Sequence, residues 1–309
     1  MIAAKSVIYE TRPPFPPGRT DQYLPDIAQD LRRLLDKTQR GLADRSVVWP
    51  GEGLTQLAAV LAEFGEDVHA DAGLWRSLEN YHREFFGTSL PLATGRDPVP
   101  PLTAFDARRL QHLLWTLWTN LPTSEGLSPT HPNLLQLAQV AGTFLEARFA
   151  PLPKDSGVKN FLASPSQFGW EIKRKLIWLG TKSYVFRWVF ADYISRLKAA
   201  ATIGNTDDFI CQESTVWAGL GAIDILAGAL DVSAEDRATL RTWYERHAAF
   251  YRVLSRQDRG GQTETILLCN LVNRQPYTVR MDTPQCPFHP GQVVFGSLTP
   301  WRGEWYWSG

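Results

Sequence analysis

Apolar residues recur at helical spacing along most of the chain. Between residues 53 and 71 they fall at i, i+3, i+4 and i+7, a pattern that predicts an amphipathic helix, which Gly73 ends. A second helix is expected from about Leu74 to Phe86. The same period predicts further helices over residues 23–36, 103–121, 133–149, 181–200, 223–230 and 233–254.

The hydrophobic period changes from 3.6 to 2 after Arg259-Gly260-Gly261. Alternation and turn residues predict short strands within residues 266–272, 277–281, 292–298 and 304–308. Strands this short in so small a segment suit a small barrel or curled sheet. Such a unit buries little surface by itself, so we expect it to dock on the helices.

The predicted fold is therefore mainly α with a small C-terminal β module, an α+β chain. A helical, bundle-like body is expected over residues 1–259 and an SH3-like small barrel over residues 260–309. Residues 11–18 contain four prolines, which forbid a helix and favour an extended polyproline II conformation. We interpret this segment as an N-terminal arm laid across the body; a ligand for an SH3-type domain is the alternative.

The last ten residues hold three of the 12 tryptophans. Exposed tryptophan promotes aggregation, so this end is expected to be folded as the closing strand of the β module. In a strand, Trp305 and Trp307 share one face and Tyr306 takes the other. We expect one face to pack on the helices; an aromatic binding groove that includes Trp301 and Trp305 is the alternative.

Composition narrows the functional classes. Lys and Arg number 32 and Asp and Glu number 32, so the net field does not attract polyanions, although a local basic patch is not excluded. Three widely spaced cysteines without a Cys-x-x-Cys pair argue against a zinc site or a disulfide framework and favour the cytoplasm. No secretory signal and no membrane-spanning apolar stretch is present, and no nucleotide-binding glycine motif occurs, so neither a membrane role nor a cofactor is predicted.

Several segments together resemble an uncharacterised bacterial family of the domain-of-unknown-function kind. The resemblance implies a helical body with a Trp-rich C-terminal β module; it implies no established activity and transfers no catalytic residue. It rests on Phe64-Gly65-Glu66-Asp67-Val68, Gly73-Leu74-Trp75-Arg76, Phe85-Phe86-Gly87-Thr88-Ser89-Leu90-Pro91, Phe288-His289-Pro290-Gly291 and Trp301-Arg302-Gly303-Glu304-Trp305-Tyr306-Trp307-Ser308-Gly309.

Two Glu-x-x-His pairs suggest a metal site: Glu66 with His69, and Glu79 with His82. This spacing puts carboxylate and imidazole on one helix face, as di-iron bundles require. Such a site also needs further glutamates from other helices, for which Glu146 is the obvious candidate. The alternative is a solvated helix face opposite the leucine stripe.

A polar segment near residue 210 suggests metal-dependent chemistry. Asp207, Asp208 and Glu213, placed in a loop between helices, could hold a divalent cation for phosphodiester hydrolysis. Cys211 could act as a nucleophile with a distant histidine. Alternatively, Asp207 caps a short helix and Cys211 is a small core residue.

Basic and aromatic residues are interleaved between residues 154 and 198, a combination that suits single-stranded nucleic acid. The alternative is a helical surface with aromatic side chains inward and charges outward. The candidate binding residues are Lys173, Arg174, Lys175, Trp178, Lys182 and Arg187, with Trp217 beyond them.

The sequence thus favours a non-enzymatic cytosolic protein that binds a protein or nucleic-acid partner. The basic-aromatic segment or the C-terminal module would supply the binding surface. A metal-dependent hydrolase or nuclease built on Asp207, Asp208 and Glu213 is the competing hypothesis.

Overall fold

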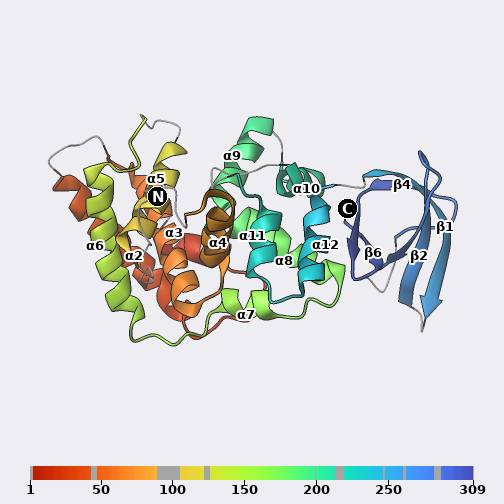
Figure 1. The fold of residues 1–309 in the computed structure, drawn as a ribbon, viewed down its shortest axis with the longest axis horizontal. Coiled ribbons are helices and arrows are strands. Elements are labelled where there is room, and N and C mark those ends of the chain that lie inside the picture. Colours follow the sequence, from red (N-terminus) through yellow and green to blue (C-terminus); the bar gives the residue numbers. More distant parts are fainter. Residues whose placement is uncertain are drawn as a thin grey trace. The chain divides into compact units, whose positions relative to one another are not determined.

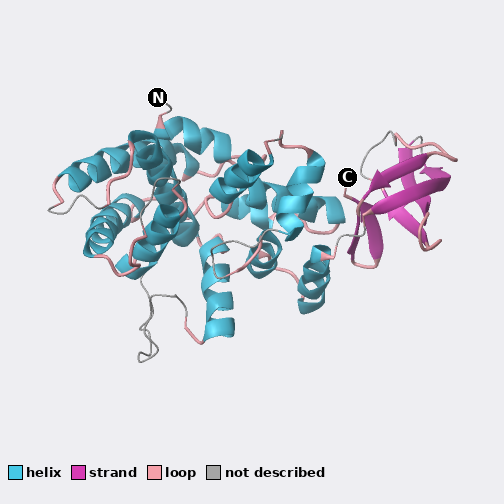
Figure 2. Ribbon diagram, turned by 90° about the horizontal axis from the view of Figure 1, so that it is seen from above, coloured by secondary structure: helices cyan, strands magenta, loops and turns pink. Residues whose placement is uncertain are grey.

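The computed structural model describes residues 3–42, 47–88, 105–121, 126–198, 200–212, 219–245, 248–259, 262–281 and 287–308. It confirms a mainly helical chain with a small C-terminal β module (Figures 1 and 2). Contacts divide the chain into two compact units, one of residues 1–163, 182–187 and 215–220 and the other of residues 164–181, 188–214 and 221–309. No helix among the described residues is long and apolar enough to span a membrane.

The first unit is organised around one long, nearly buried helix, α3 (Gly51–Ala70), which the leucine stripe predicted. Gly65 allows close packing there, because a Cβ atom at this position would lie 2.5 Å from the Phe149 ring. The other helices of this unit are α1 (Ala4–Thr11), α2 (Leu24–Arg40), α4 (Leu74–Phe86), α5 (Ala107–Thr119), α6 (Pro132–Phe149) and α7 (Gly157–Ala163), with a 3-10 turn at Asp21–Tyr23.

The short junction between α3 and α4 is held by a buried carboxylate. Oδ1 of Asp67 accepts from the backbone N–H groups of Gly73 and Leu74 at 2.9 and 3.1 Å, and Oδ2 accepts from that of Trp75 at 2.7 Å. These are the donors that the start of a helix leaves without intrahelical partners. The hydroxyl of Tyr184 donates to the same carboxylate at 2.7 Å.

The second unit contains five helices among its described residues: α8 (Gly169–Lys182), α9 (Arg187–Leu197), α10 (Ile203–Gln212), α11 (Ala222–Ala229) and α12 (Ala234–Arg241). The predicted single helix over residues 181–200 is wrong, because the buried turn at residues 183–186 separates α8 from α9. The prediction that residues 233–254 are one helix is also wrong: α12 ends at Arg241 and a strand begins at Ala249.

The β module is a curled six-stranded sheet with the order β4-β1-β2-β3-β6-β5. Pairing is antiparallel except between β3 and β6, which run parallel. The edge strands β4 and β5 follow each other in the chain with only Ser297 between them. The strands are β1 (Ala249–Arg259), β2 (Gln262–Asn270), β3 (Pro276–Arg280), β4 (Val293–Gly296), β5 (Leu298–Trp301) and β6 (Glu304–Trp307).

The tryptophan-rich end forms the β5–β6 hairpin, which packs on helices of its own unit. Trp301 is fully buried, and its indole N–H donates to the carbonyl of Ser166 at 3.1 Å. Tyr306 lies against Gly169, where a Cβ atom would come within 2.5 Å of its ring. The indole N–H of Trp243, just after α12, donates to the Pro300 carbonyl at 2.7 Å.

Candidate functional site

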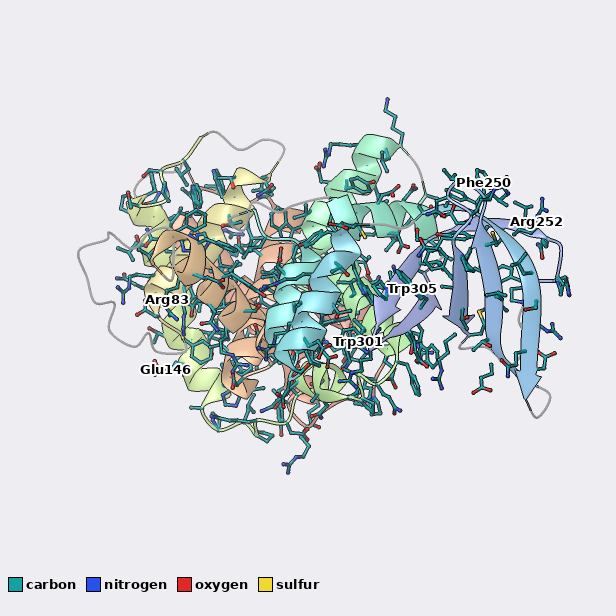
Figure 3. All side chains as sticks on the ribbon, turned by 45° about the vertical axis from the view of Figure 1, so that its right-hand side comes forward. Arg83, Glu146, Phe250, Arg252, Trp301 and Trp305 are labelled. Atoms are coloured by element: carbon teal, nitrogen blue, oxygen red, sulfur yellow. The ribbon has the colours of Figure 1, made fainter. Side chains whose placement is uncertain are left out.

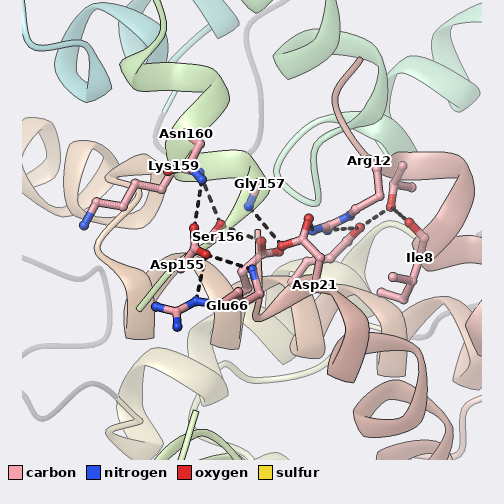
Figure 4. Close-up of polar contacts among 12 residues, drawn as sticks. Ile8, Arg12, Asp21, Glu66, Asp155, Ser156, Gly157, Lys159 and Asn160 are labelled. Atoms are coloured by element: carbon pink, nitrogen blue, oxygen red, sulfur yellow. Dashed lines mark hydrogen bonds and ion pairs between the residues drawn. The ribbon is translucent and has the colours of Figure 1, made fainter. Parts of the chain in front are cut away.

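The first Glu-x-x-His pair is occupied by contacts within the protein. Oε2 of Glu66 lies 2.6 Å from Nη1 of Arg12, and its Oε1 accepts from the hydroxyl of Ser156 at 2.6 Å (Figure 4). Nε2 of His69 lies 3.1 Å from the carbonyl oxygen of Leu152. The fully buried carboxylate therefore joins α1 to the start of α7.

Glu66 belongs to a buried cluster with more carboxylates than cations. Arg12 also lies 3.6 Å from Glu63 and 3.9 Å from Asp21, and Arg187 forms an ion pair with Glu63. Burial raises the pKa of Glu66, because the neighbouring guanidinium only partly offsets the loss of water. Arg187, one of the predicted binding residues, is therefore held in an ion pair with a residue of α3.

The second Glu-x-x-His pair is occupied in the same way. The carboxylate of Glu79 takes two bonds from Arg109, at 2.7 and 2.8 Å, and one from the indole of Trp75 at 2.9 Å. Nδ1 of His82 lies 2.7 Å from the carbonyl oxygen of Thr88. In the described part of the chain, no group of three or more His, Cys, Asp or Glu side chains is placed to hold a metal ion.

Asp207 lies on α10 rather than in a loop, and its carboxylate is 2% exposed. Oδ1 lies 2.5 Å from Nζ of Lys173 on α8, and Oδ2 accepts from the hydroxyl of Ser308 at 3.1 Å. Nζ of Lys173 also donates to that hydroxyl oxygen at 2.6 Å. The three side chains close a ring of hydrogen bonds that ties α8, α10 and the residue after β6 together.

The neighbouring candidates differ in environment. Cys211 lies one turn after Asp207, and burial raises the pKa of its thiol to about 11, so the nucleophilic thiolate is scarce at neutral pH. Asp208 is half-buried on the same helix. Glu213 lies outside the described residues, so a cation site with all three predicted ligands stays a prediction.

The basic-aromatic segment does not present its cations together. Lys175 is 1% exposed, and its Nζ donates to the Ser164 carbonyl at 2.6 Å and to the Ser166 hydroxyl at 2.8 Å. Burial lowers the pKa of Lys175 to about 8. Lys173 and Arg187 lie in the ion pairs described above.

The remaining members of that segment divide between core and surface. Trp178 is buried, whereas Arg174 and Lys182 are exposed on α8. Trp217 lies outside the described residues. In the C-terminal hairpin, Trp301 is fully buried and Trp305 packs edge-on against Tyr277, with ring centroids 5.0 Å apart. These indoles contribute to packing inside their own unit.

An exposed surface that the sequence analysis missed lies on the outer face of β1 and β4. Phe250 and Phe295 are cross-strand partners, 55% and 61% exposed, with ring centroids 5.0 Å apart. Two positions along, Arg252 faces Val293, which is 47% exposed. We call Phe250, Arg252, Val293 and Phe295 the outer patch; Figure 3 labels its two β1 residues.

The outer patch follows from simple alternation along β1. Tyr251 and Val253 point into the sheet's core, so Phe250 and Arg252 point outward. The sequence analysis assigned residues 233–254 to a helix and therefore missed the strand. The residue types did not reveal it, because residues 249–254 are apolar on both faces except at Arg252 and so show no period of 2.

Arg252 brings a charge to this apolar surface. Among the described residues, none forms a hydrogen bond or ion pair with its side chain, which is exposed. Other arginines of the module have carboxylate partners: Arg256 lies 2.9 Å from Asp258, and Arg280 lies 2.6 Å from Glu304. The outer patch is therefore two rings and an aliphatic side chain around one uncompensated cation.

Comparison with known proteins assigns a family. Residues 14–199, more than half of the chain, match a family described as a protein of unknown function (DUF3843). The chain belongs to this family. The match confirms the expected membership in an uncharacterised family and contains the resembling segments from residues 64 to 91, whereas residues 288–291, residues 301–309 and the outer patch lie beyond it.

No curated protein and no solved structure matches the chain. The family description names no activity. The functional argument therefore rests on the geometry of the described residues.

Proposed function

We propose that this protein is a non-enzymatic binding protein whose β module binds a protein partner through the outer patch. The observation that carries the proposal is the pair Phe250 and Phe295, held in cross-strand register and each more than half exposed. Exposing two adjacent rings to water is unfavourable, and contiguous apolar surface of this kind is typical of interaction sites. Aromatic residues and arginine are also the types enriched at energetically important interface positions.

The balance of charge favours a protein over a nucleic acid. Residues 249–309 contain six arginines and no lysine. Arginine is enriched in protein interfaces and lysine is depleted, whereas nucleic-acid affinity depends on several cations that contact phosphates. Arg256, Arg280 and Arg302 already have carboxylate partners. Among the four residues of the outer patch, Arg252 is the one cation.

The basic-aromatic segment is the weaker surface for this function. Lys173, Lys175 and Arg187 are held by groups of the protein itself, and Trp178 is buried. Using them for binding would first require breaking these contacts. The outer patch needs no such rearrangement.

Capture by full-length protein tests the proposal when matched variants are compared. Replacing both rings, Phe250→Ser with Phe295→Ser, should abolish capture of a specific protein from a lysate of the cells that make this chain. The control replaces Phe85 and Phe86 with serine, because these rings on α4 are 61% and 59% exposed. The control should capture the same protein as the wild type.

Two results would contradict the proposal. The first is an identical captured set for the wild type and both double variants. The second is recovery of nucleic acid alone, which would assign the rings of the outer patch to base stacking instead.

A further inference from the structure

We infer that the segment that binds the outer patch carries a carboxylate between apolar side chains. This inference rests on the proposed function and specifies the chemistry of its partner. It starts from the position of Arg252, two residues from Phe250 on the same strand face and directly opposite Val293.

A partner that covers the two rings must also cover part of the arginine. Side chains two positions apart on one strand, and those opposite on its neighbour, lie within reach of the same contacting segment. A guanidinium stays charged at every physiological pH, so it cannot reduce its cost of desolvation by losing a proton. Removing it from water without an anion would oppose binding.

The described carboxylates of the module, Asp258, Glu264 and Glu304, form no ion pair with Arg252. Asp258 pairs with Arg256, while Glu304 pairs with Arg280 and accepts from the hydroxyl of Tyr306. The partner must then bring its own anion. The planar fork of a guanidinium fits a carboxylate with two parallel hydrogen bonds, which makes Asp or Glu the matching residue.

The apolar part of the recognised segment follows from the remaining members of the outer patch. Phe250 and Phe295 offer rings beside the cation along the two strands, and Val293 offers methyl groups directly opposite it. A segment with aromatic or branched aliphatic residues beside its carboxylate would make both the apolar contacts and the ion pair with Arg252. Such a segment has apolar, acidic, apolar character over a few residues.

A peptide library displayed on phage provides a probe that needs no known partner. Full-length wild-type protein should enrich peptides with Asp or Glu beside aromatic or aliphatic residues. For one enriched peptide, changing its acid to the amide should weaken binding to wild type about tenfold or more, as for a charge pair in an interface. The same change should have little effect on binding to Arg252→Met, because the pair is already broken.

Further variants distinguish the possible outcomes. Arg252→Glu should enrich peptides that carry Lys or Arg instead. Arg83 is exposed on α4, so Arg83→Met should behave as the wild type. Arg252→Lys keeps the charge without the fork and should give an intermediate loss. Equal circular dichroism spectra would establish that every variant is folded.

Failure of the inference differs from failure of the proposed function. Two results would overturn the carboxylate inference alone. In the first, the enriched peptides need both rings for binding but carry no Asp or Glu. In the second, changing the peptide's acid to the amide weakens its binding to wild type and to Arg252→Met equally. Peptides that bind the wild type and the Phe250→Ser, Phe295→Ser variant equally, or no enrichment at all, would overturn the proposed function as well.

Discussion

The buried pair of Lys173 and Asp207 makes a quantitative prediction. Asp207→Asn keeps the shape of the side chain but leaves a cation that is 14% exposed with neutral acceptors alone, the amide oxygen and the Ser308 hydroxyl 2.6 Å away. Breaking one side of a buried ion pair costs about 3–5 kcal/mol, because the other charge stays out of water. Lys173→Met should cost a similar amount, since the carboxylate is only 2% exposed.

The double variant separates the pair from its surroundings. Lys173→Met with Asp207→Asn leaves no buried charge, so its loss should be smaller than the sum of the single losses by about 1–3 kcal/mol. The matched control is the exposed pair Arg196 and Asp192 on α9, at 59% and 66% side-chain exposure. Arg196→Met and Asp192→Asn should each lower the free energy of unfolding by less than about 1 kcal/mol.

Urea unfolding of the full chain, followed by tryptophan fluorescence, measures these differences. A loss of about 3 kcal/mol in a unit of this size corresponds to roughly 6–12 °C in thermal midpoint. A loss below about 1 kcal/mol for Asp207→Asn, or single losses that add fully in the double variant, would refute the reasoning. Either result would mean that water reaches the pair.

Three further predictions follow from described contacts. Gly169→Ala should cost about 1–3 kcal/mol because the new methyl group meets the ring of Tyr306, while Gly51→Ala, which meets nothing within 4 Å, should be neutral in the same urea titration. Burial lowers the pKa of His112 to about 3 in the folded protein. As the pH falls below 6.5, His112 is therefore protonated in the unfolded chain but stays neutral in the folded one. The free energy of unfolding should then fall by about 2 kcal/mol between pH 6.5 and 5, and His112→Gln should lose that part of the slope; a slope identical to wild type would contradict it. Deleting residues 301–309 should destabilise the entire β module, and protection from hydrogen exchange that is unchanged in β1 and β2 would count against this.

The long helix α3 could be predicted because its information is local. The stripe between residues 53 and 71 continues through five turns of α3, so the period dominates every shorter pattern. β1 could not be found in this way. Its exposed phenylalanine and leucine residues resemble the apolar positions of a helix, and its alternation covers only a few residues before a bulge after Val253.

The candidate site depended on contacts that residue spacing does not encode. Ser308 lies 135 positions after Lys173, and Arg12 lies 54 positions before Glu66. The Glu-x-x-His spacing was real, but the partners that occupy those side chains come from distant helices. Residue spacing therefore suggests candidate groups, while the fold decides which of their side chains are already held by other parts of the protein.

The parallel pairing of β3 with β6 has a consequence for biosynthesis. β6 is the last of the six strands along the chain, yet it lies between β3 and β5 in the sheet. While a ribosome is still making residues 304–308, β3 has an open edge and the cavity for Tyr306 beside Gly169 is unfilled. The first unit can fold during this time, since domains fold as units from the N-terminus onward. The β module can fold only once its own last strand has emerged, so a stalled or shortened chain would expose an unpaired strand edge to chaperones and proteases.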